Sequence, residues 1–307
     1  MNIVIDRAIE HLQSSGGIST MWRALRPLIE AALPEYTFDP SMPADVFLST
    51  YYQPAPSGAK SIAVVYDYLA TRFPGISRYT PDNEWKYAAV ANADDVIAIS
   101  QWTADDVLRF QGRRAAVAYL ATDLQRASYH AVQAFKAKYN LPDTYILIVG
   151  RRDLYKNVSS YWQAARLMNP RPFVVCVGGE DMTIPQPHST HLRLTPDELS
   201  AAYTGALCLV YPSIYEGFGL PVIEAYTCGC PVICGDGGAL AEINGGACVV
   251  DVTKPRDIAE AVMRMHDHSV RIEHIMKGFD EVSRFSWAKT AQEFAGVIRR
   301  VAERVEA

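Results

Sequence analysis

Short apolar runs alternate with helical segments along this sequence, and after residue 142 the alternation begins again. A break at Leu141-Pro142-Asp143 separates two sets of strand-like runs: 2–6, 46–50, 61–67, 95–100 and 117–121, then 145–150, 173–178, 207–211, 231–234 and 248–251. Alternating strands and helices predict mostly parallel sheets with helices packed against them. We therefore predict an α/β protein with two Rossmann-like, doubly wound domains that face a cleft.

The segment Tyr211–Ala225, YPSIYEGFGLPVIEA, combines a strand end, a glycine loop and the start of a helix. Gly217 and Gly219 allow a tight loop whose backbone a ligand can approach closely. The free N–H groups and the positive dipole end of the helix that follows form an anion site. Glu216 and Glu224 flank this site, and carboxylates accept hydrogen bonds from hydroxyls rather than bind phosphate. A phosphate with hydroxyls on both sides describes a nucleotide sugar.

In this setting the two glutamates resemble the E-x7-E motif of family 4 of the retaining glycosyltransferases with the GT-B fold, the glycosyltransferase group 1 enzymes. The resemblance implies that Glu216 contacts the donor sugar and that Glu224 holds the ribose. It also implies that the diphosphate meets the backbone of the loop, which consists of Gly217, Phe218, Gly219 and Leu220.

The resemblance also covers the end of the chain. FSWAKTA at 285–291 is similar to the family's segment that precedes a last helix crossing back to the first domain. We therefore expect an acceptor-side domain over 1–125 together with 286–307, and a domain that binds the nucleotide sugar over 126–285.

Cations gather in GRRDLYKN, residues 150–157, between a strand and a helix. Positive charges at the start of a helix oppose the helix dipole, so binding of a diphosphate explains them better than the fold does. The segment is similar to the family's GRxxxxKN, which implies that Arg151 and Lys156 hold the leaving diphosphate. Arg152 departs from the family pattern and receives no role. A solvated basic loop is the alternative interpretation.

The charge of a departing diphosphate is stabilised either by a divalent ion or by fixed positive groups. The sequence contains no D-x-D triplet of the kind that holds such an ion. We therefore expect no metal cofactor and a metal-independent reaction. The six cysteines all lie in the second half, mostly inside apolar runs, and are expected to be core residues.

The first domain offers weaker candidates. Gly16 and Gly17 follow its first strand and are similar to a family glycine pair that closes over the diphosphate; an ordinary turn is the alternative. Tyr66 and Asp67 end another strand, where the family often has His-Asp, and we predict them as donor-site residues against a structural alternative. Gly178-Gly179-Glu180 and His191–Leu194 are predicted to end or form strands and are expected near the base. Two acidic pairs, Asp94-Asp95 and Asp105-Asp106, are expected to be solvated.

Together these features predict a retaining glycosyltransferase. It would transfer a hexose from a nucleotide diphosphate sugar of the GDP-mannose or UDP-glucose type to a hydroxyl of a glycan or lipid-linked acceptor. A nucleotide-sugar epimerase shares the architecture, but its first-domain carboxylates are not identifiable. An NAD-dependent oxidoreductase lacks its G-x-G-x-x-G. A non-catalytic nucleotide-sugar-binding protein is the alternative from another class, favoured by Tyr66 in place of histidine.

Composition limits the partners. The 307 residues, 49% hydrophobic and 21% charged, are typical of an ordinary globular protein, and the net charge of −5 argues against nucleic acid. The first residues read as a strand rather than a signal peptide, and no apolar run approaches the about 18–20 residues that span a bilayer. We expect a cytoplasmic protein. A lipid-linked acceptor would bring it to the inner face of a membrane, where Trp22, Arg23 and Arg26 are the candidates for peripheral contact. Against such contact, the first 125 residues contain 10 Lys and Arg and 14 Asp and Glu, so no broad basic patch supports it.

Overall fold

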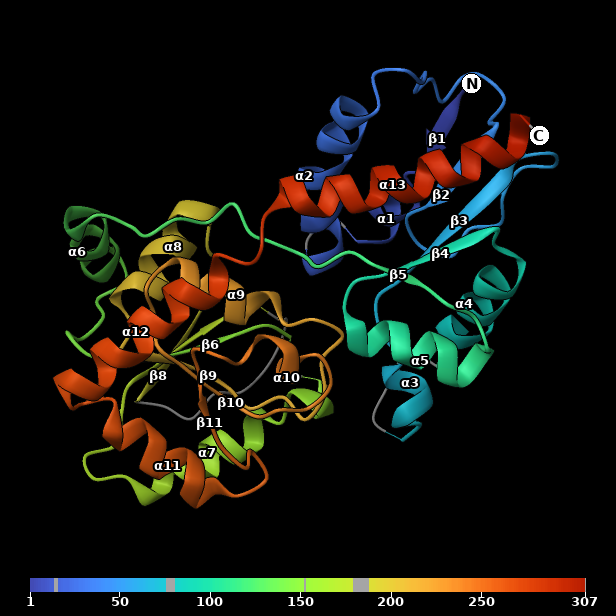
Figure 1. Ribbon diagram of the computed structural model, residues 1–307. Helices are drawn as coiled ribbons and strands as arrows, with labels where there is room; N and C mark the ends of the chain where they lie inside the picture. Colours follow the sequence, from blue (N-terminus) through green and yellow to red (C-terminus); the bar gives the residue numbers. More distant parts are fainter. Residues whose placement is uncertain (14–15, 76–80, 152, 179–187, 307) are drawn as a thin grey trace. The chain divides into compact units, whose positions relative to one another are not determined.

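The computed structural model describes residues 1–13, 16–75, 81–151, 153–178 and 188–306, and the chain divides into two compact units (Figure 1). The first unit comprises Met1–Ala121 and Phe285–Ala307, and the second comprises Thr122–Arg284. The sequence analysis places the two divisions after residues 125 and 285, whereas this division falls after residues 121 and 284. Each unit is built on one parallel sheet.

The first unit contains a five-stranded sheet whose strands follow one another in sequence order, β1-β2-β3-β4-β5. Each strand overlaps one of the predicted apolar runs: β1 (Ile3–Ile5), β2 (Val46–Ser49), β3 (Lys60–Val65), β4 (Asp95–Ala98) and β5 (Ala116–Val117). The helices are α1 (Ala8–Leu12), α2 (Gly17–Ala32), α3 (Leu69–Arg72), α4 (Pro81–Asn92), α5 (Gln101–Gln111) and α13 (Trp287–Glu306).

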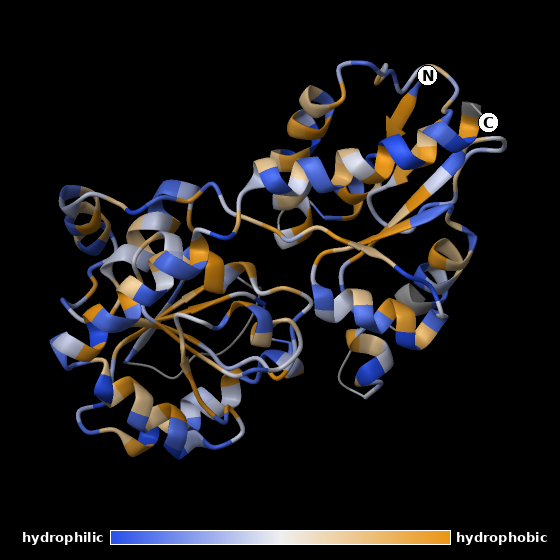
Figure 2. Cartoon of the chain, viewed as in Figure 1, coloured by the Kyte–Doolittle hydropathy of each residue, from blue (hydrophilic) through white to orange (hydrophobic). Residues whose placement is uncertain are grey.

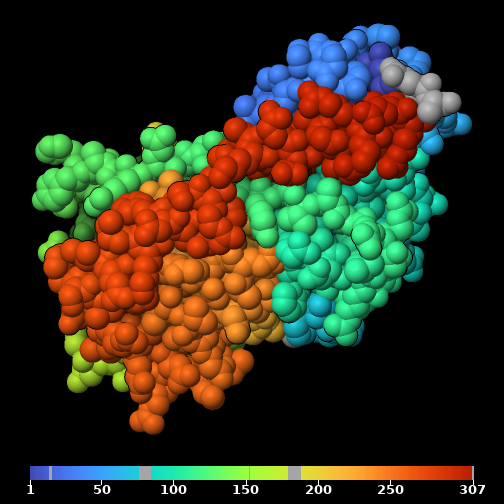
Figure 3. All heavy atoms as spheres, in the orientation of Figure 1, coloured from blue at the N-terminus to red at the C-terminus, as the bar shows by residue number. Residues whose placement is uncertain are grey.

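Helices pack on this sheet in two groups. On one face of the sheet, Ala63, Val65 and Val96 belong to a hydrophobic cluster with residues of α4 and α5. Because successive side chains of a strand point to opposite faces, Ile62 and Val64 lie on the other face of the sheet. α13 packs against α2 and runs across β2 to β5, and Figures 1 and 3 show it on the surface of the unit. The rings of Trp22 and Phe294 meet edge to face at 5.7 Å between centroids. The apolar stripe of the last helix is therefore buried in the first unit.

The second unit contains a six-stranded sheet in the order β11-β10-β9-β6-β7-β8, so the strand order reverses between β6 and β9. Its strands are β6 (Ile146–Val149), β7 (Val174–Val177), β8 (Ser189–Leu192), β9 (Cys208–Tyr211), β10 (Val232–Cys234) and β11 (Cys248–Val249). This is the doubly wound arrangement that the alternation of strands and helices predicts. β8 is matched only in part, by the predicted segment His191–Leu194, because its sequence, STHL, is mostly polar and it lies at the sheet edge.

Helices surround the second sheet. They are α6 (Tyr129–Lys138), α7 (Val158–Leu167), α8 (Pro196–Gly205), α9 (Leu220–Thr227), α10 (Leu240–Ile243), α11 (Pro255–Arg264) and α12 (His268–Val282), with a 3-10 turn, η1 (Leu154–Lys156). α7 packs against α11, α12 against α9, and α6 against α8. All six cysteines are buried, as predicted, and the apolar strands lie inside each unit in Figure 2. None of the described helices is long and apolar enough to cross a membrane.

A capping box formed by Thr195 and Glu198, with Pro196 between them, marks the start of α8. The Thr195 hydroxyl accepts a hydrogen bond from the Glu198 amide at 3.3 Å, and the Glu198 carboxylate accepts one from the Thr195 amide at 2.9 Å. Two otherwise unpaired N–H groups are thereby satisfied, which fixes where the helix begins.

Two residues of the first unit that the sequence suggested for its surface are buried: the prediction for Asp106 is wrong, and the burial of Trp22 argues against a membrane contact there. Asp106 is 1% exposed and forms a bidentate pair with the Arg72 guanidinium, with 2.8 Å between Nε and Oδ2, whereas Asp105 is exposed. Trp22 is also 1% exposed, and its Nε1 donates to the Tyr66 hydroxyl at 2.7 Å. Arg26 donates to backbone carbonyls of the same unit. A membrane contact through Trp22 would require this packing to open.

Candidate functional site

The candidate site lies at the carboxyl ends of β6 and β9, the neighbouring strands between which the order of the second sheet reverses. Ligands of doubly wound sheets bind outside the strand ends at such a reversal. Gly150 follows β6 and Pro212 follows β9, so the two segments singled out in the sequence, GRRDLYKN and YPSIYEGFGLPVIEA, leave the sheet side by side. The Ile214 amide donates to the Tyr155 carbonyl at 2.9 Å and ties the two segments together.

Lys156 and Glu216, separated by 60 residues, form an ion pair at this point. The Lys156 Nζ lies 2.6 Å from the Glu216 Oε1 and 2.7 Å from the Tyr211 hydroxyl oxygen. The two side chains are 12% and 10% exposed. The ammonium also lies 4.9 Å from the centre of the Tyr211 ring and 5.1 Å from that of Tyr155. The η1 turn after β6 brings the lysine to this position.

A glycine loop after β10 supports the backbone around Glu216. Gly238 bridges to Glu216, and the Ala239 amide donates to the Glu216 carbonyl at 2.9 Å. A Cβ at Gly238 would lie 2.4 Å from the Glu216 carbonyl oxygen, and one at Gly237 would lie 2.0 Å from that of Ile214. No residue other than glycine fits at either position. The sequence analysis missed this loop, although a glycine pair directly after an apolar run is a recognisable signal.

Glu224 lies in the second turn of α9, partly buried, and its Oε2 accepts a hydrogen bond of 2.7 Å from the Tyr203 hydroxyl. Burial raises the pKa of Glu224, and the bond from Tyr203 opposes that rise. The carboxylate therefore lies in a water-poor position with one defined donor.

The loop between the two glutamates is held by packing. Gly219 has φ +108° and caps α9; a Cβ there would lie 2.8 Å from the Leu240 Cδ2 and 3.0 Å from the Ile243 Cδ1. Phe218 is 3% exposed, while Gly217 and Leu220 are partly exposed. The loop therefore presents backbone rather than large side chains before the first turn of α9.

Arg151 follows β6 and Gly178 follows β7, so both lie at the carboxyl ends of neighbouring strands. The Arg151 side chain is 53% exposed and its Nε lies 3.7 Å from the Asp153 Oδ2. Gly150 has φ +118°, and a Cβ there would be 3.9 Å from the Lys156 Nζ. Gly178 has φ +80°, and a Cβ added there would lie 3.8 Å from backbone atoms of Gly150. Of the segment predicted near the base, Gly179 and Glu180 lie outside the described residues, as does Arg152.

The first-unit candidates have partners inside their own unit. The Tyr66 hydroxyl accepts from the Trp22 Nε1 at 2.7 Å and donates to the Thr50 carbonyl at 2.5 Å, and burial raises its pKa. Asp67 accepts from the Leu69 amide at 2.9 Å. These bonds favour the structural alternative for Tyr66. Gly16, with φ +137°, caps α2, which begins at Gly17, so both glycines also have a role in the turn.

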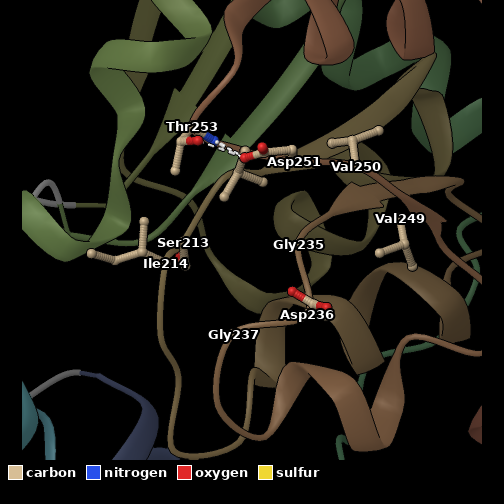
Figure 4. A pocket seen from close by; sticks show the side chains of 10 residues that line it. Ser213, Ile214, Gly235, Asp236, Gly237, Val249, Val250, Asp251 and Thr253 are labelled. Carbon is tan, nitrogen blue, oxygen red and sulfur yellow. Dashed lines mark hydrogen bonds between the residues drawn. The ribbon is translucent and has the colours of Figure 1, made fainter.

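A pocket of about 530 Å³ opens at the carboxyl ends of β9, β10 and β11 (Figure 4). Its wall includes Ser213 and Ile214, which directly precede the Glu216 segment, and the carboxylates of Asp236 and Asp251. Thr253 donates to Asp251 through its hydroxyl at 2.6 Å and its amide at 3.0 Å. These two bonds, together with one from Lys254, lower the pKa of Asp251 to about 2. Among the described residues no group of three or more His, Cys, Asp or Glu is placed to hold a metal ion.

This fold and site define the second unit as a Rossmann-like domain with its charged groups at the topological switch point. Residues 131–274 match the family described as glycosyl transferases group 1. The chain thus carries, in this unit, a domain of the group 1 glycosyl transferases.

Curated relatives agree with that family. The chain is 27% identical over 265 residues to serotype-specific mannosyltransferase WbdA of Escherichia coli, covering 76% of this chain and 32% of the relative. It is 39% identical over 102 residues to O-antigen chain mannosyltransferase B of the same species, covering 32% and 26%. A third relative, the MMP alpha-(1->4)-mannosyltransferase of Mycolicibacterium hassiacum, is 35% identical over 125 residues, covering 38% and 30%. The matches span about a quarter to a third of these relatives.

Solved structures share the fold. Alr3699/HepE of Anabaena in complex with UDP-glucose superimposes with a TM-score of 0.78 at 13% identity, covering 97% of this chain and 99% of that one. Sucrose-phosphate synthase of Thermosynechococcus elongatus gives a TM-score of 0.70 at 21% identity, covering 93% and 80%. The two Rossmann-like units are thus those of a GT-B fold.

Proposed function

We propose that this protein is a metal-independent, retaining glycosyltransferase that moves a hexose from a nucleotide diphosphate sugar to an acceptor hydroxyl. The observation that carries the proposal is the Lys156–Glu216 pair at the strand-order reversal, beside the start of α9. A cation that reaches phosphate and a carboxylate that reaches sugar hydroxyls lie next to each other there, as a nucleotide sugar requires.

Each charged group receives one role. Lys156 and the half-exposed Arg151 bind the diphosphate, together with the backbone of residues 217–220 at the N-terminus of α9. Glu216 accepts hydrogen bonds from the sugar, and Glu224 accepts them from the ribose. Two of the three N–H groups of Lys156 are engaged by Glu216 and Tyr211, which leaves the third for a phosphate oxygen.

The reaction follows from these roles. The acceptor oxygen bonds to the anomeric carbon of the donor as the bond from that carbon to the β-phosphate oxygen breaks. Lys156 and Arg151 stabilise the negative charge that develops on the departing diphosphate, and Glu216 holds the hexose in place. The acceptor proton passes to the β-phosphate on the same face of the sugar, so the configuration is retained without a protein nucleophile.

The donor and acceptor classes rest on the relatives. Three of them are mannosyltransferases, which favours GDP-mannose, and a structural neighbour binds UDP-glucose, which makes that donor the second choice. One relative acts on an O-antigen chain, which favours a glycan or lipid-linked glycan as acceptor. Such an acceptor would be met in the cytoplasm at the inner face of a membrane.

Calorimetry and turnover test this proposal together. GDP, UDP and ADP, free and as their hexose conjugates, are titrated with EDTA present, and release of free nucleotide is then followed with an acceptor glycan. We expect one nucleotide to bind without metal and its conjugate to be consumed. Binding without consumption would support the non-catalytic alternative, to which the internal hydrogen bonds of Tyr66 also point. Absence of binding by all six ligands would refute both.

A further inference from the structure

Tyr203 is a buried residue of α8 whose hydroxyl group reaches the candidate site. Its side chain is 0% exposed, and its hydroxyl donates to the Glu224 Oε2 at 2.7 Å. Among the described residues Glu224 has no second hydrogen-bond donor to its carboxylate, so Oε1 is left for another partner. A hydroxyl that is shielded from water and aimed at one oxygen of a site carboxylate constrains the direction of the other oxygen.

The tyrosine is itself held from both sides. The carbonyl of Ala202 accepts from the Tyr145 hydroxyl at 2.7 Å. The hydroxyl of Thr204 accepts from the Ala127 amide at 3.0 Å and donates to the Cys228 carbonyl at 3.2 Å, which ties α8 to the end of α9. Both chain neighbours of Tyr203 are thus fixed. These bonds hold the backbone that carries the buried Tyr203 side chain next to α9.

The chemistry of the pair also favours a positioning role. Burial raises the pKa of Glu224, and a hydroxyl that donates to its carboxylate favours the ionised form. Burial raises the pKa of Tyr203 as well, so the hydroxyl keeps its proton and remains a donor. An ionised carboxylate with one oxygen engaged offers the other as an acceptor for vicinal hydroxyls.

We propose that Tyr203 is a positioning residue for the nucleotide: it holds Glu224 through Oε2 so that Oε1 accepts from the ribose hydroxyls. This inference rests on the proposed function, since it takes the ribose of a nucleoside diphosphate as the group that Glu224 contacts. It adds a residue outside both charged segments, on the helix that precedes β9.

The test uses Tyr203→Phe in the full chain and the nucleoside diphosphate that the wild type binds most tightly among GDP, UDP and ADP. Calorimetry with EDTA gives its Kd and that of its 2′-deoxy form. We expect Tyr203→Phe to weaken the ribonucleotide about tenfold, since the lost bond has a charged acceptor. The preference for ribose over deoxyribose should shrink, and this ratio, measured on one sample, does not depend on the fraction of protein that is folded.

Tyr161→Phe is the matched control. Tyr161 is also 0% exposed, but its hydroxyl has no hydrogen-bond partner in the described part of the chain, and it is a residue of α7 that packs in the core of the second unit. Its removal should leave both Kd values and their ratio unchanged. If Tyr203→Phe behaves like this control while Glu224→Ala weakens the ribonucleotide, the positioning role is refuted and the proposed function stands.

A double variant separates positioning from stability. If Tyr203 acts through Glu224, Tyr203→Phe combined with Glu224→Ala should bind the ribonucleotide as weakly as Glu224→Ala alone. A further loss in the double variant would mean that Tyr203 supports the fold and would overturn the inference. If Glu224→Ala leaves the Kd unchanged, the ribose contact of the proposed function fails first, and the role of Tyr203 fails with it.

Discussion

Each unit contains a nearly buried ion pair, and the two pairs differ in geometry and surroundings. In the first unit the Arg72 guanidinium forms two bonds with the Asp106 carboxylate and lies 5.0 Å from the centre of the Trp102 ring. In the second unit Lys156 makes a single contact with Glu216 at the end of two strands. The first pair joins α3 to α5, whereas the second joins two loops where the strand order reverses.

Under the proposed function, this difference separates an ion pair that stabilises the fold from one that binds a ligand. A bidentate pair uses both oxygens of Asp106, whose side chain is 1% exposed, so a ligand has little to approach. Lys156 and Glu216 each keep a polar group beyond their mutual bond and retain some exposure. We infer that burial alone does not mark a functional ion pair. A functional ion pair is better recognised by its position relative to the sheet and by the polar atoms that remain able to bind a ligand.

The largest expected effect concerns the first pair. Arg72→Ala removes the bidentate partner of the buried Asp106 carboxylate, so the free energy of unfolding should fall by about 3–5 kcal/mol. Urea unfolding of the full chain measures this change. Asp105→Asn is the control, because Asp105 is the exposed neighbour, and it should change stability by less than about 0.5 kcal/mol. Equal effects of the two variants would show that the buried pair is not structural.

The second pair should respond in activity. Lys156→Ala removes a positive group from the leaving diphosphate and should slow hexose transfer by about 10²–10³-fold, measured as nucleotide release. Saturating nucleotide should raise the melting temperature of the wild type much more than that of the variant.

Lys138→Ala provides the comparison for that experiment. Lys138 is 61% exposed and pairs with Glu198 on the surface of the same unit. Its loss should leave transfer and the nucleotide-induced rise in melting temperature unchanged. A variant of Lys156 that transfers hexose at the wild-type rate would remove the basis for assigning the second pair to a ligand.

Tyr66→Phe gives a smaller effect and sharpens the contrast between the units. The substitution leaves the buried Trp22 Nε1 and the Thr50 carbonyl without the Tyr66 hydroxyl, so the free energy of unfolding should fall by about 1–3 kcal/mol. Nucleotide affinity, measured by calorimetry, tests its predicted place in the donor site. A weaker affinity with unchanged stability would support that prediction against the structural alternative.

Much of the second unit follows from its sequence because its signals are local. The apolar runs around β6, β7 and β9 are bounded by glycine or proline, and the charged segments follow two of them directly. The polar edge strand β8 has a weaker signal, and the predicted segment His191–Leu194 covers only its last two residues. The sequence analysis also could not show that Lys156 meets Glu216, because 60 residues separate them and only the strand order brings β6 beside β9.

The first unit shows a different limit. Asp105 and Asp106 look alike in sequence, yet one is exposed and the other is paired with Arg72, because the turn of α5 directs adjacent side chains to different sides. Trp22 beside arginines resembles a surface patch, but its indole N–H bonds to Tyr66. Tyr203 gave no signal, since a tyrosine in a helix is usually a core residue. Partner choice over long separations decides such cases.

The smallest expected effect is a pH dependence of nucleotide binding. Burial raises the pKa of Glu224 above its ordinary 4.5, with the bond from Tyr203 opposing the rise. As an acceptor for ribose hydroxyls Glu224 must be ionised, so binding should be complete well above the raised pKa and weaken by about tenfold as the pH falls through it. The raised pKa also means that the folded chain holds this proton more tightly than the unfolded chain does. The stability that protonated Glu224 contributes is therefore lost as the pH rises.

Glu224→Gln isolates this titration from that of the ligand. The glutamine cannot ionise, while the phosphate groups titrate identically with both proteins, so the ratio of the two Kd values at each pH reports Glu224 alone. We expect calorimetry to give a ratio that is constant above the raised pKa of Glu224 and approaches one as the pH falls through it. A ratio that does not change with pH would mean that the charge of Glu224 does not contribute to binding. The contrast between the units would then rest on Lys156 and Glu216 alone.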